Sequence, residues 1–163
     1  MLTHEESIAV IEFEAQDKQS YLARLYESDG DEIGSFQILG DQWRLDAKFV
    51  KMKYWSNLLG LDSRYGLERL QGRYSNIDDE NSKPHLAHDL GEDAVIEFFT
   101  IFGWSPFVDS SYGSSSYTDI DINNRYEVFK TQTGLLIRSG PIPVTEEDEG
   151  IVSRVISSVK GAF

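Results

Sequence analysis

The segment from residue 43 to residue 54 constrains the fold most, because apolar and charged residues alternate along it. As far as residue 49, every second residue is apolar and a charged residue stands between each pair. A period of two predicts a β-strand with one face toward a core and the other toward solvent. From Val50 on, the apolar positions shift by one. A β-bulge or sharp bend there would keep both apolar sets on one core, so the segment predicts a strongly curved sheet or a partial barrel.

Short apolar stretches bounded by turn residues predict further strands on both sides of this one. They cover residues 8–13, 21–26, 33–39, 67–74 and 135–138. An alternating run from residue 118 to residue 128 predicts a hairpin, with Asn123-Asn124 as its two-residue turn. The polar segments 76–84 and Ser110 to Ser116 are predicted to be loops, and the second of these is a candidate lid over a pocket.

Two helices are expected as well. Residues 91–102 place apolar side chains on one helical face, and Gly103 suits the end of that helix. Thr145 is a good N-cap for a second helix, whose apolar stripe runs from Ile151 to Val159. We therefore predict one α+β domain over residues 1–163, a curved antiparallel sheet or partial barrel with two packed helices. The stripe on the last helix suits internal packing or a homodimer, and the sequence leaves both open.

Charge limits the choice of partner. The formal net charge is −13, so nucleic acid is a poor partner for this chain, because its phosphates would be repelled. Residues 44–73 differ from the rest, with seven basic and three acidic side chains and a local sum of +4. A basic segment in an acidic chain indicates either an anion site or cations that pair with the protein's own acids.

The sequence has no pattern typical of catalysis or of a cofactor site. It lacks cysteine, a phosphate-binding loop and a nucleophile elbow. Residues 119–130 begin like a calcium loop, but Lys130 stands where that loop requires a bidentate glutamate. His85 and His88 are two imidazoles without an enclosing zinc motif. We predict no catalytic residue, no metal ion and no cofactor.

A binding site is easier to envisage. Arginines stand close in sequence to tyrosines and tryptophans, and a guanidinium both binds carboxylates and stacks on rings. Such a pocket would suit an anionic or planar ligand. The candidate ligand-binding residues are Arg44, Arg64, Arg69, Arg73, Trp104 and Tyr112. The alternative is that the aromatic residues fill a β-rich core and have no role in binding.

Three stretches of the chain carry a resemblance to a known family. They are Gly40-Asp41-Gln42-Trp43-Arg44-Leu45-Asp46-Ala47-Lys48, then Leu58-Leu59-Gly60-Leu61-Asp62 with Tyr65 and Leu67-Glu68-Arg69-Leu70-x-Gly72-Arg73-Tyr74, and last Phe102-Gly103-Trp104-x-Pro106 with Val108-Asp109 and Tyr112-Gly113-Ser114. Together they resemble a family of uncharacterised proteobacterial proteins often labelled "cation/multidrug efflux pump". The family brings no known catalytic residues.

The resemblance also implies a cellular setting. Family members typically carry one or two hydrophobic helices ahead of this domain, joined by a basic connection. The positive-inside rule then implies a membrane-anchored protein with this domain outside the cytoplasm, in the periplasm. The sequence itself has no run of the about 18 apolar residues that a spanning helix needs, so the chain as given is expected to be soluble. The pump label therefore does not describe this chain.

The leading hypothesis is a non-enzymatic binding or interaction module of a membrane-anchored envelope protein. Its recognition surface would lie around Arg44, Arg64, Arg69 and Arg73 and would take an unknown protein or a small anionic ligand. One alternative is a small-molecule-binding or hydrolytic domain with a pocket under Ser110 to Ser116. Another, which depends on the family label alone, is an accessory part of an efflux system.

Overall fold

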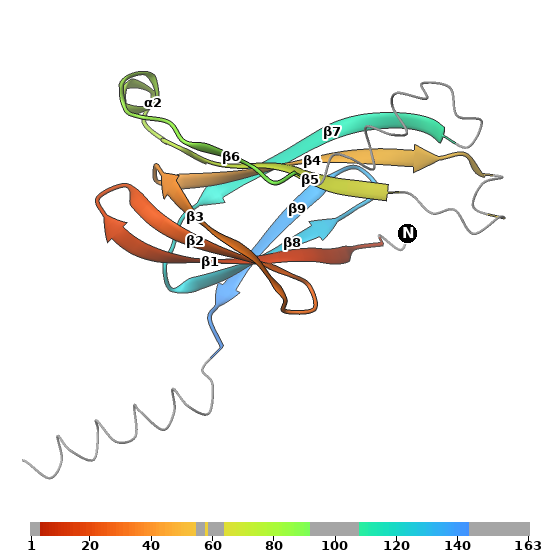
Figure 1. Ribbon diagram of the computed structural model, residues 1–163, viewed down its shortest axis with the longest axis horizontal. Coiled ribbons are helices and arrows are strands. Elements are labelled where there is room, and N and C mark those ends of the chain that lie inside the picture. The colour runs from red at the N-terminus through yellow and green to blue at the C-terminus, as the bar shows by residue number, and fades with distance from the viewer. Residues whose placement is uncertain (1–3, 55–57, 59–63, 92–107, 144–163) are drawn as a thin grey trace, which may run out of the picture.

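Two antiparallel sheets facing each other make up the computed structural model, which describes residues 4–54, 58, 64–91 and 108–143 (Figure 1). Sheet A has the order β3-β2-β1-β8-β9. Its strands are β1 (Glu6–Asp17), β2 (Ser20–Glu27), β3 (Glu32–Leu39), β8 (Asn124–Lys130) and β9 (Leu135–Pro141). Sheet B has the order β6-β5-β4-β7. Its strands are β4 (Gln42–Met52), β5 (Arg64–Arg73), β6 (Ala87–Asp89) and β7 (Val108–Asp119).

The predicted α+β class is wrong. The described residues form nine strands, and the helix among them, α2 (Ile77–Ser82), is only six residues long. The core cluster draws its side chains from both sheets, so within the described ranges the two sheets pack directly against each other with no helix between them. The two expected helices, from residue 91 and from Thr145, lie almost wholly outside the described residues.

Three aromatic rings fix the centre of the core. Trp43 of β4 is fully buried, and its ring centroid lies 5.8 Å from that of Phe13 and 5.5 Å from that of Tyr126. Phe13 and Tyr126, both from sheet A, meet edge to face at 5.6 Å. Such contacts contribute about 0.5–1.5 kcal/mol each beyond the burial of apolar area. Trp43, the first apolar residue of the alternating segment, therefore packs sheet B against sheet A.

The strand predicted from residue 43 is confirmed, but the bulge at Val50 is not. β4 pairs with β7 without interruption from Gln42 to Lys51, so Phe49 and Val50 point to opposite faces. Phe49 belongs to the core cluster, whereas Val50 is 1 % exposed and lies outside that cluster. In the ladder with β7 the register shifts after Lys51, and in the ladder with β5 it shifts between Asp46 and Ala47, so neither shift lies at Val50. The end of β4 is buried on both faces, and this, not a slip in register, is the reason for the change in pattern.

The chain crosses from sheet A to sheet B at Gly40 and Asp41. Gly40 has φ +138°, and a Cβ there would collide with the backbone of Arg73. The Asp41 carboxylate accepts hydrogen bonds from the backbone N–H of Ser75 at 2.7 Å and from its hydroxyl at 2.6 Å. These contacts tie the crossing to the end of β5.

The predicted loop at Ser110 to Ser116 and the predicted hairpin after it are both wrong. The serine-rich segment is part of β7 and pairs with β4, while the following strand, β8, pairs with β1 in the other sheet. The turn between them, closed by Asn124 N–H to Asp121 C=O at 3.2 Å, is thus a second crossing between sheets. The Tyr126 hydroxyl stabilises it, because it donates to the Asp119 carbonyl and accepts from the Asp121 N–H, both at 2.7 Å.

Glycines of positive φ stand in the turns that join β2 to β3 and β8 to β9, Gly30 at +99° and Gly134 at +142°. The segment 76–84, predicted as a loop, contains α2, which Asn76 caps by accepting from two backbone N–H groups. Among the described residues, no helix is long and apolar enough to span a bilayer.

Candidate ligand-binding cleft

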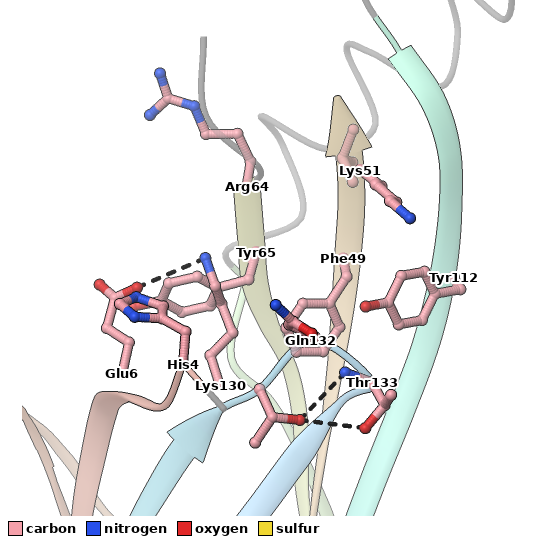
Figure 2. Close-up of a pocket in the computed structure, with 12 residues that line it drawn as sticks. His4, Glu6, Phe49, Lys51, Arg64, Tyr65, Tyr112, Lys130, Gln132 and Thr133 are labelled. Carbon is pink, nitrogen blue, oxygen red and sulfur yellow. Dashed lines mark hydrogen bonds and ion pairs between the residues drawn. The ribbon is translucent and has the colours of Figure 1, made fainter. Parts of the chain in front are cut away.

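A cleft of about 1220 Å³ opens where the ends of the two sheets separate (Figure 2). Sheet B supplies the ends of β4 and β5 and one side chain of β7, and sheet A supplies the start of β1 and the β8–β9 turn. The lining residues are His4, Glu6, Phe49, Val50, Lys51, Arg64, Tyr65, Tyr112, Lys130, Thr131, Gln132 and Thr133. Residues from five strands or their ends thus meet in one concavity.

Three aromatic rings form the wall of the cleft on sheet B. Strand register places them side by side, because Phe49 is the Cα partner of both Tyr65 on β5 and Tyr112 on β7. The rings of Phe49 and Tyr112 are stacked, with centroids 5.3 Å apart and planes 14° apart. Tyr65 is tilted by 36° to Phe49 at 6.5 Å. Phe49 is almost fully buried, so the half-buried Tyr65 and Tyr112 are the rings that can contact a planar or apolar group.

Cations stand on both sides of these rings. Lys130, on the sheet A side, lies 5.4 Å above the Tyr65 ring, with its Nζ 3.6 Å from Glu6 Oε2. Lys51 and Arg64, on the sheet B side, are exposed, and within the described part of the chain neither has an acidic partner. Figure 2 shows these two side chains extending from the ends of their strands at the mouth of the cleft. Three cations against one carboxylate give the cleft a positive potential in a chain of net charge −13.

The β8–β9 turn forms the lower rim and is held by its own hydrogen bonds. The Thr131 hydroxyl donates to the Gly134 carbonyl at 2.9 Å and accepts from the Thr133 N–H at 3.2 Å. The Thr131 and Thr133 hydroxyls lie 3.4 Å apart. No histidine or carboxylate among the described residues bonds to either hydroxyl, so the rim offers polar contacts and no activated nucleophile.

The structure separates the predicted ligand-binding residues. Arg64 and Tyr112 line the cleft. Arg44, Arg69 and Arg73 lie instead on the face of sheet B that points away from sheet A, because their strand neighbours Leu45, Leu70 and Gly72 are buried. Trp104 lies outside the described residues.

The outward arginines have mixed surroundings. Arg44 Nε donates to Asp46 at 2.8 Å, an ion pair of the kind expected if these cations only balance the protein's own acids. The Arg73 guanidinium lies 3.8 Å above the ring of Tyr117, which is 53 % exposed. Arg69 is exposed and stands opposite Asp46 in the strand register. The outer face around these arginines is therefore polar and partly neutralised.

Sequence reasoning missed Lys130 and Phe49 and did not single out Lys51 from the basic segment. Lys130 is distant in sequence from that segment and reaches the cleft only because β8 lies beside β1. Phe49 carries the signal of a core residue, and it is both core and cleft wall. The signal that could have identified Phe49 is that it lies opposite Tyr65 and Tyr112 in the sheet. That signal can be used only once it is known that β4 pairs with both β5 and β7.

The histidines do not assemble a metal site with other described residues. His85 Nε2 contacts the Glu80 carbonyl at 2.6 Å, and His88 Nε2 contacts the Gln37 carbonyl of β3 at 2.7 Å. Among described residues, the group of three potential ligands is Glu27, Asp29 and Asp31, all exposed in the β2–β3 turn. An exposed acidic turn of this kind is common without an ion.

Neither a protein-family model nor a curated protein nor a solved structure matches this chain.

Proposed function

We propose that this protein is a non-enzymatic binding module that holds an anionic ligand with a planar or apolar part in the cleft. One observation carries the proposal: three cations, Lys51 and Arg64 of sheet B and Lys130 of sheet A, line the same cleft as the stacked rings of Phe49 and Tyr112. A concave site with a few convergent charges and an aromatic wall is the usual form of a ligand pocket.

The chemistry of the lining favours binding over hydrolysis. Lysine and arginine recognise carboxylate, sulfonate or phosphate groups, and the rings add stacking and cation–π contacts. The Thr131 and Thr133 hydroxyls bond within their own turn, without a base beside them. The segment from Ser110 to Ser116 is a paired strand, so it does not serve as a loop that closes over a substrate.

Anilinonaphthalene sulfonate is a suitable probe, because it combines an anion with fused rings and fluoresces when it leaves water. We expect saturable binding to the wild-type chain. The double variant Lys51→Gln/Arg64→Gln should weaken it about five- to thirtyfold, since two ion pairs of about 0.5–1 kcal/mol are lost. Arg69→Gln is the matched control, because it removes one of the same charges from the outer face.

Equal weakening by the control variant, or no weakening by the double variant, would contradict the proposal. Thermal unfolding of each variant shows whether the fold is intact. Because Lys51 and Arg64 are exposed, we expect melting temperatures close to that of the wild type. Affinity should also fall as salt is raised, since the cations at the mouth are open to solvent.

A second candidate is a protein-binding surface on the outer face of sheet B. The specific observation is that Arg73 lies on an exposed tyrosine, Tyr117, with Arg69 exposed on the same strand. Arginine and tyrosine are the residues that most often carry binding energy in interfaces. Replacing Arg69 and Arg73 with Ala should weaken capture of a protein partner and leave the melting temperature nearly unchanged; a large drop would make them structural.

The family resemblance adds a setting to this proposal. It favours a domain anchored to a bacterial membrane and facing the periplasm, and an accessory role in efflux is an expectation of the family label alone. Fractionation of cells that express the full native protein, with and without protease added to the periplasm, tests this. Protease resistance in intact spheroplasts would contradict it.

A further inference from the structure

β7 is a long edge strand whose stretch from Ser110 to Thr118 lacks the usual protection, since its register shift lies at its start, between Val108 and Ser110. It ends the order of sheet B and is twelve residues long. From Ser110 to Thr118 it contains no charged residue and no proline. Proteins normally protect long edges with lysine, proline, a bulge or a short strand, because an open edge pairs with other chains.

The other edges of the two sheets have such protection. β6 is only three residues long. β9 contains Arg138 and Pro141. β3 is covered from the other sheet, because His88 of β6 bonds to its Gln37 carbonyl and lies against Phe36 at 5.1 Å. β7 is the exception among the described strands.

Within Ser110 to Thr118, the one hydrogen bond described outside the ladder with β4 is made by a side chain of the inner face. The Ser114 hydroxyl accepts from the backbone N–H of Leu135, at the start of β9, at 3.1 Å. This contact uses a side chain and leaves the backbone groups of the edge unused. In the described part of the chain β7 pairs with β4 alone. No described residue pairs with the open side of Ser110 to Thr118, and among the described residues the backbone groups there are left for one more strand.

Cations lie within reach of that edge on both faces of the sheet. On the inner face, Tyr112 brings the edge to the cleft and its lysines and arginine. On the outer face, Lys48 and Arg44 of β4 stand opposite Gly113 and Tyr117. Each is ion-paired to an acid of the same face, Lys48 to Glu68 at 3.4 Å and Arg44 to Asp46 at 2.8 Å, so within the described residues the cleft supplies the unpaired cations. Gly113 is too small to shield Lys48 from a strand added beyond it, whereas the exposed Ser115 stands opposite Asp46.

We propose that the cleft and the β7 edge together bind an acidic peptide in extended conformation, which adds to sheet B as a further strand beside β7. Backbone hydrogen bonds give the affinity in this mode, and the alternate side chains give the specificity. One set of peptide side chains enters the mouth of the cleft beside Tyr112 and the other lies over Gly113 and Ser115. The inference rests on the proposed function, because the cations of the cleft are what select an acidic peptide.

The size of the cleft supports a peptide. Pockets for small molecules usually measure about 300–1,000 Å³. The cleft measures about 1220 Å³ and is open at its mouth, so a compact small molecule would leave part of it filled by water. A stretch of peptide whose alternate side chains enter from the edge fills the same space with several small groups.

The probe is an acetylated, fluorescein-labelled peptide of alternating aspartate and tyrosine, about eight residues long to match the edge. Fluorescence anisotropy with the full wild-type chain should show saturable binding. The same peptide with lysine in place of aspartate should not bind. Hydrogen exchange of backbone amides within residues 110–118 should slow when the acidic peptide is present.

Two N-methylated forms of the acidic peptide test strand addition itself. A strand uses only every second residue to bond to one neighbour. Methylating one alternate set of peptide nitrogens should therefore weaken binding by about a hundredfold or abolish it, and methylating the other set should be tolerated. Equal affinity of both methylated forms and the parent would overturn strand addition.

A matched pair of protein variants locates the site. Ser115→Glu puts a negative charge beside the added strand and should weaken the peptide about two- to fivefold. Ser139→Glu makes the same change on the exposed part of β9 and should leave the affinity unchanged. If the wild type binds anilinonaphthalene sulfonate in the charge-dependent way described above but not the acidic peptide, this inference fails and the proposed cleft function stands. If neither probe binds, the proposed function fails as well.

Discussion

The ring of Tyr112 stacks on the ring of Phe49 across the β4–β7 ladder, with centroids 5.3 Å apart and an interplanar angle of 14°. Phe49 is 4 % exposed and belongs to the core, whereas Tyr112 is only half-buried. The pair thus links the interior of the sandwich to the wall of the cleft. Core packing fixes the Phe49 ring, and this ring holds the Tyr112 ring in a defined orientation at the wall of the cleft.

Replacing the half-buried ring tests its part in binding. Tyr112→Leu should weaken anilinonaphthalene sulfonate about two- to tenfold, because one stacking contact of about 0.5–1.5 kcal/mol is lost. Tyr112→Phe keeps the ring and should bind like the wild type. Fluorescence titration of the two variants checks this, and equal loss in both would assign the effect to the hydroxyl and not to stacking.

The cleft shows what strand periodicity can and cannot predict. The alternation around Trp43 correctly predicts which face of β4 is buried, and the basic segment identifies Arg64 as a candidate binding residue. The convergence of Phe49, Tyr65 and Lys130 depends on which strands are neighbours and in which register. Nothing in the local pattern encodes that β8 returns to β1, because register is fixed by long-range packing and by the links between sheets.

Any side chain at Gly72 should lower the free energy of unfolding. A Cβ there would collide with the Leu39 carbonyl oxygen, and backbone atoms of two crossing strands cannot move aside cheaply. We expect Gly72→Ala to destabilise the fold by about 3 kcal/mol, at the upper end of the cost of overpacking. Chemical denaturation measures this loss.

Gly113→Ala is the control for that variant. Its Cβ would meet nothing closer than the Ala47 carbonyl oxygen at 4.0 Å. The substitution should be neutral or slightly stabilising, since alanine has less freedom to lose on folding than glycine. A loss at Gly113 as large as that at Gly72 would mean that glycine is needed for reasons other than space.

The serine-rich strand shows why the fold class was predicted wrongly. On the inner face of β7 the positions opposite Ala47, Leu45 and Trp43 hold Ser114, Ser116 and Thr118. These side chains are half-buried at the margin of the sandwich, where hydroxyls keep contact with water. The segment therefore lacks the apolar alternation of a strand and has the composition of a loop. Because this segment was predicted to be a loop, a second sheet was not predicted, and two helices were expected to cover the core instead.

Tyr126 should be essential to the crossing between β7 and β8. Tyr126→Phe would leave the Asp119 carbonyl and the Asp121 N–H without the partner they share in the fold. We expect a loss of about 1–3 kcal/mol in the free energy of unfolding. Tyr26→Phe is the control, because that hydroxyl has no hydrogen bond to another described residue. Similar melting temperatures for the two variants would contradict the role of the hydroxyl.

Two tyrosines should make stability fall in alkali. Burial is the largest cause that raises the pKa of Tyr74, followed by the carboxylate of Glu80, and burial is also the largest cause that raises the pKa of Tyr126. The folded state thus holds these phenol protons more tightly than the unfolded chain, where the pKa is 10.0.

The resulting stability is fully present below pH 10 and is lost as the pH rises from there through the folded pKa of each group. Between those two pKa values each tyrosine contributes a loss of about 1.4 kcal/mol per pH unit. Denaturant unfolding at a series of alkaline pH values should show this fall, and tyrosinate absorbance should show that Tyr74 and Tyr126 ionise above pH 10. The variant Tyr74→Phe/Tyr126→Phe should be less stable at neutral pH but nearly flat across the same range. An equally steep fall in that variant would show that other groups cause the alkaline loss.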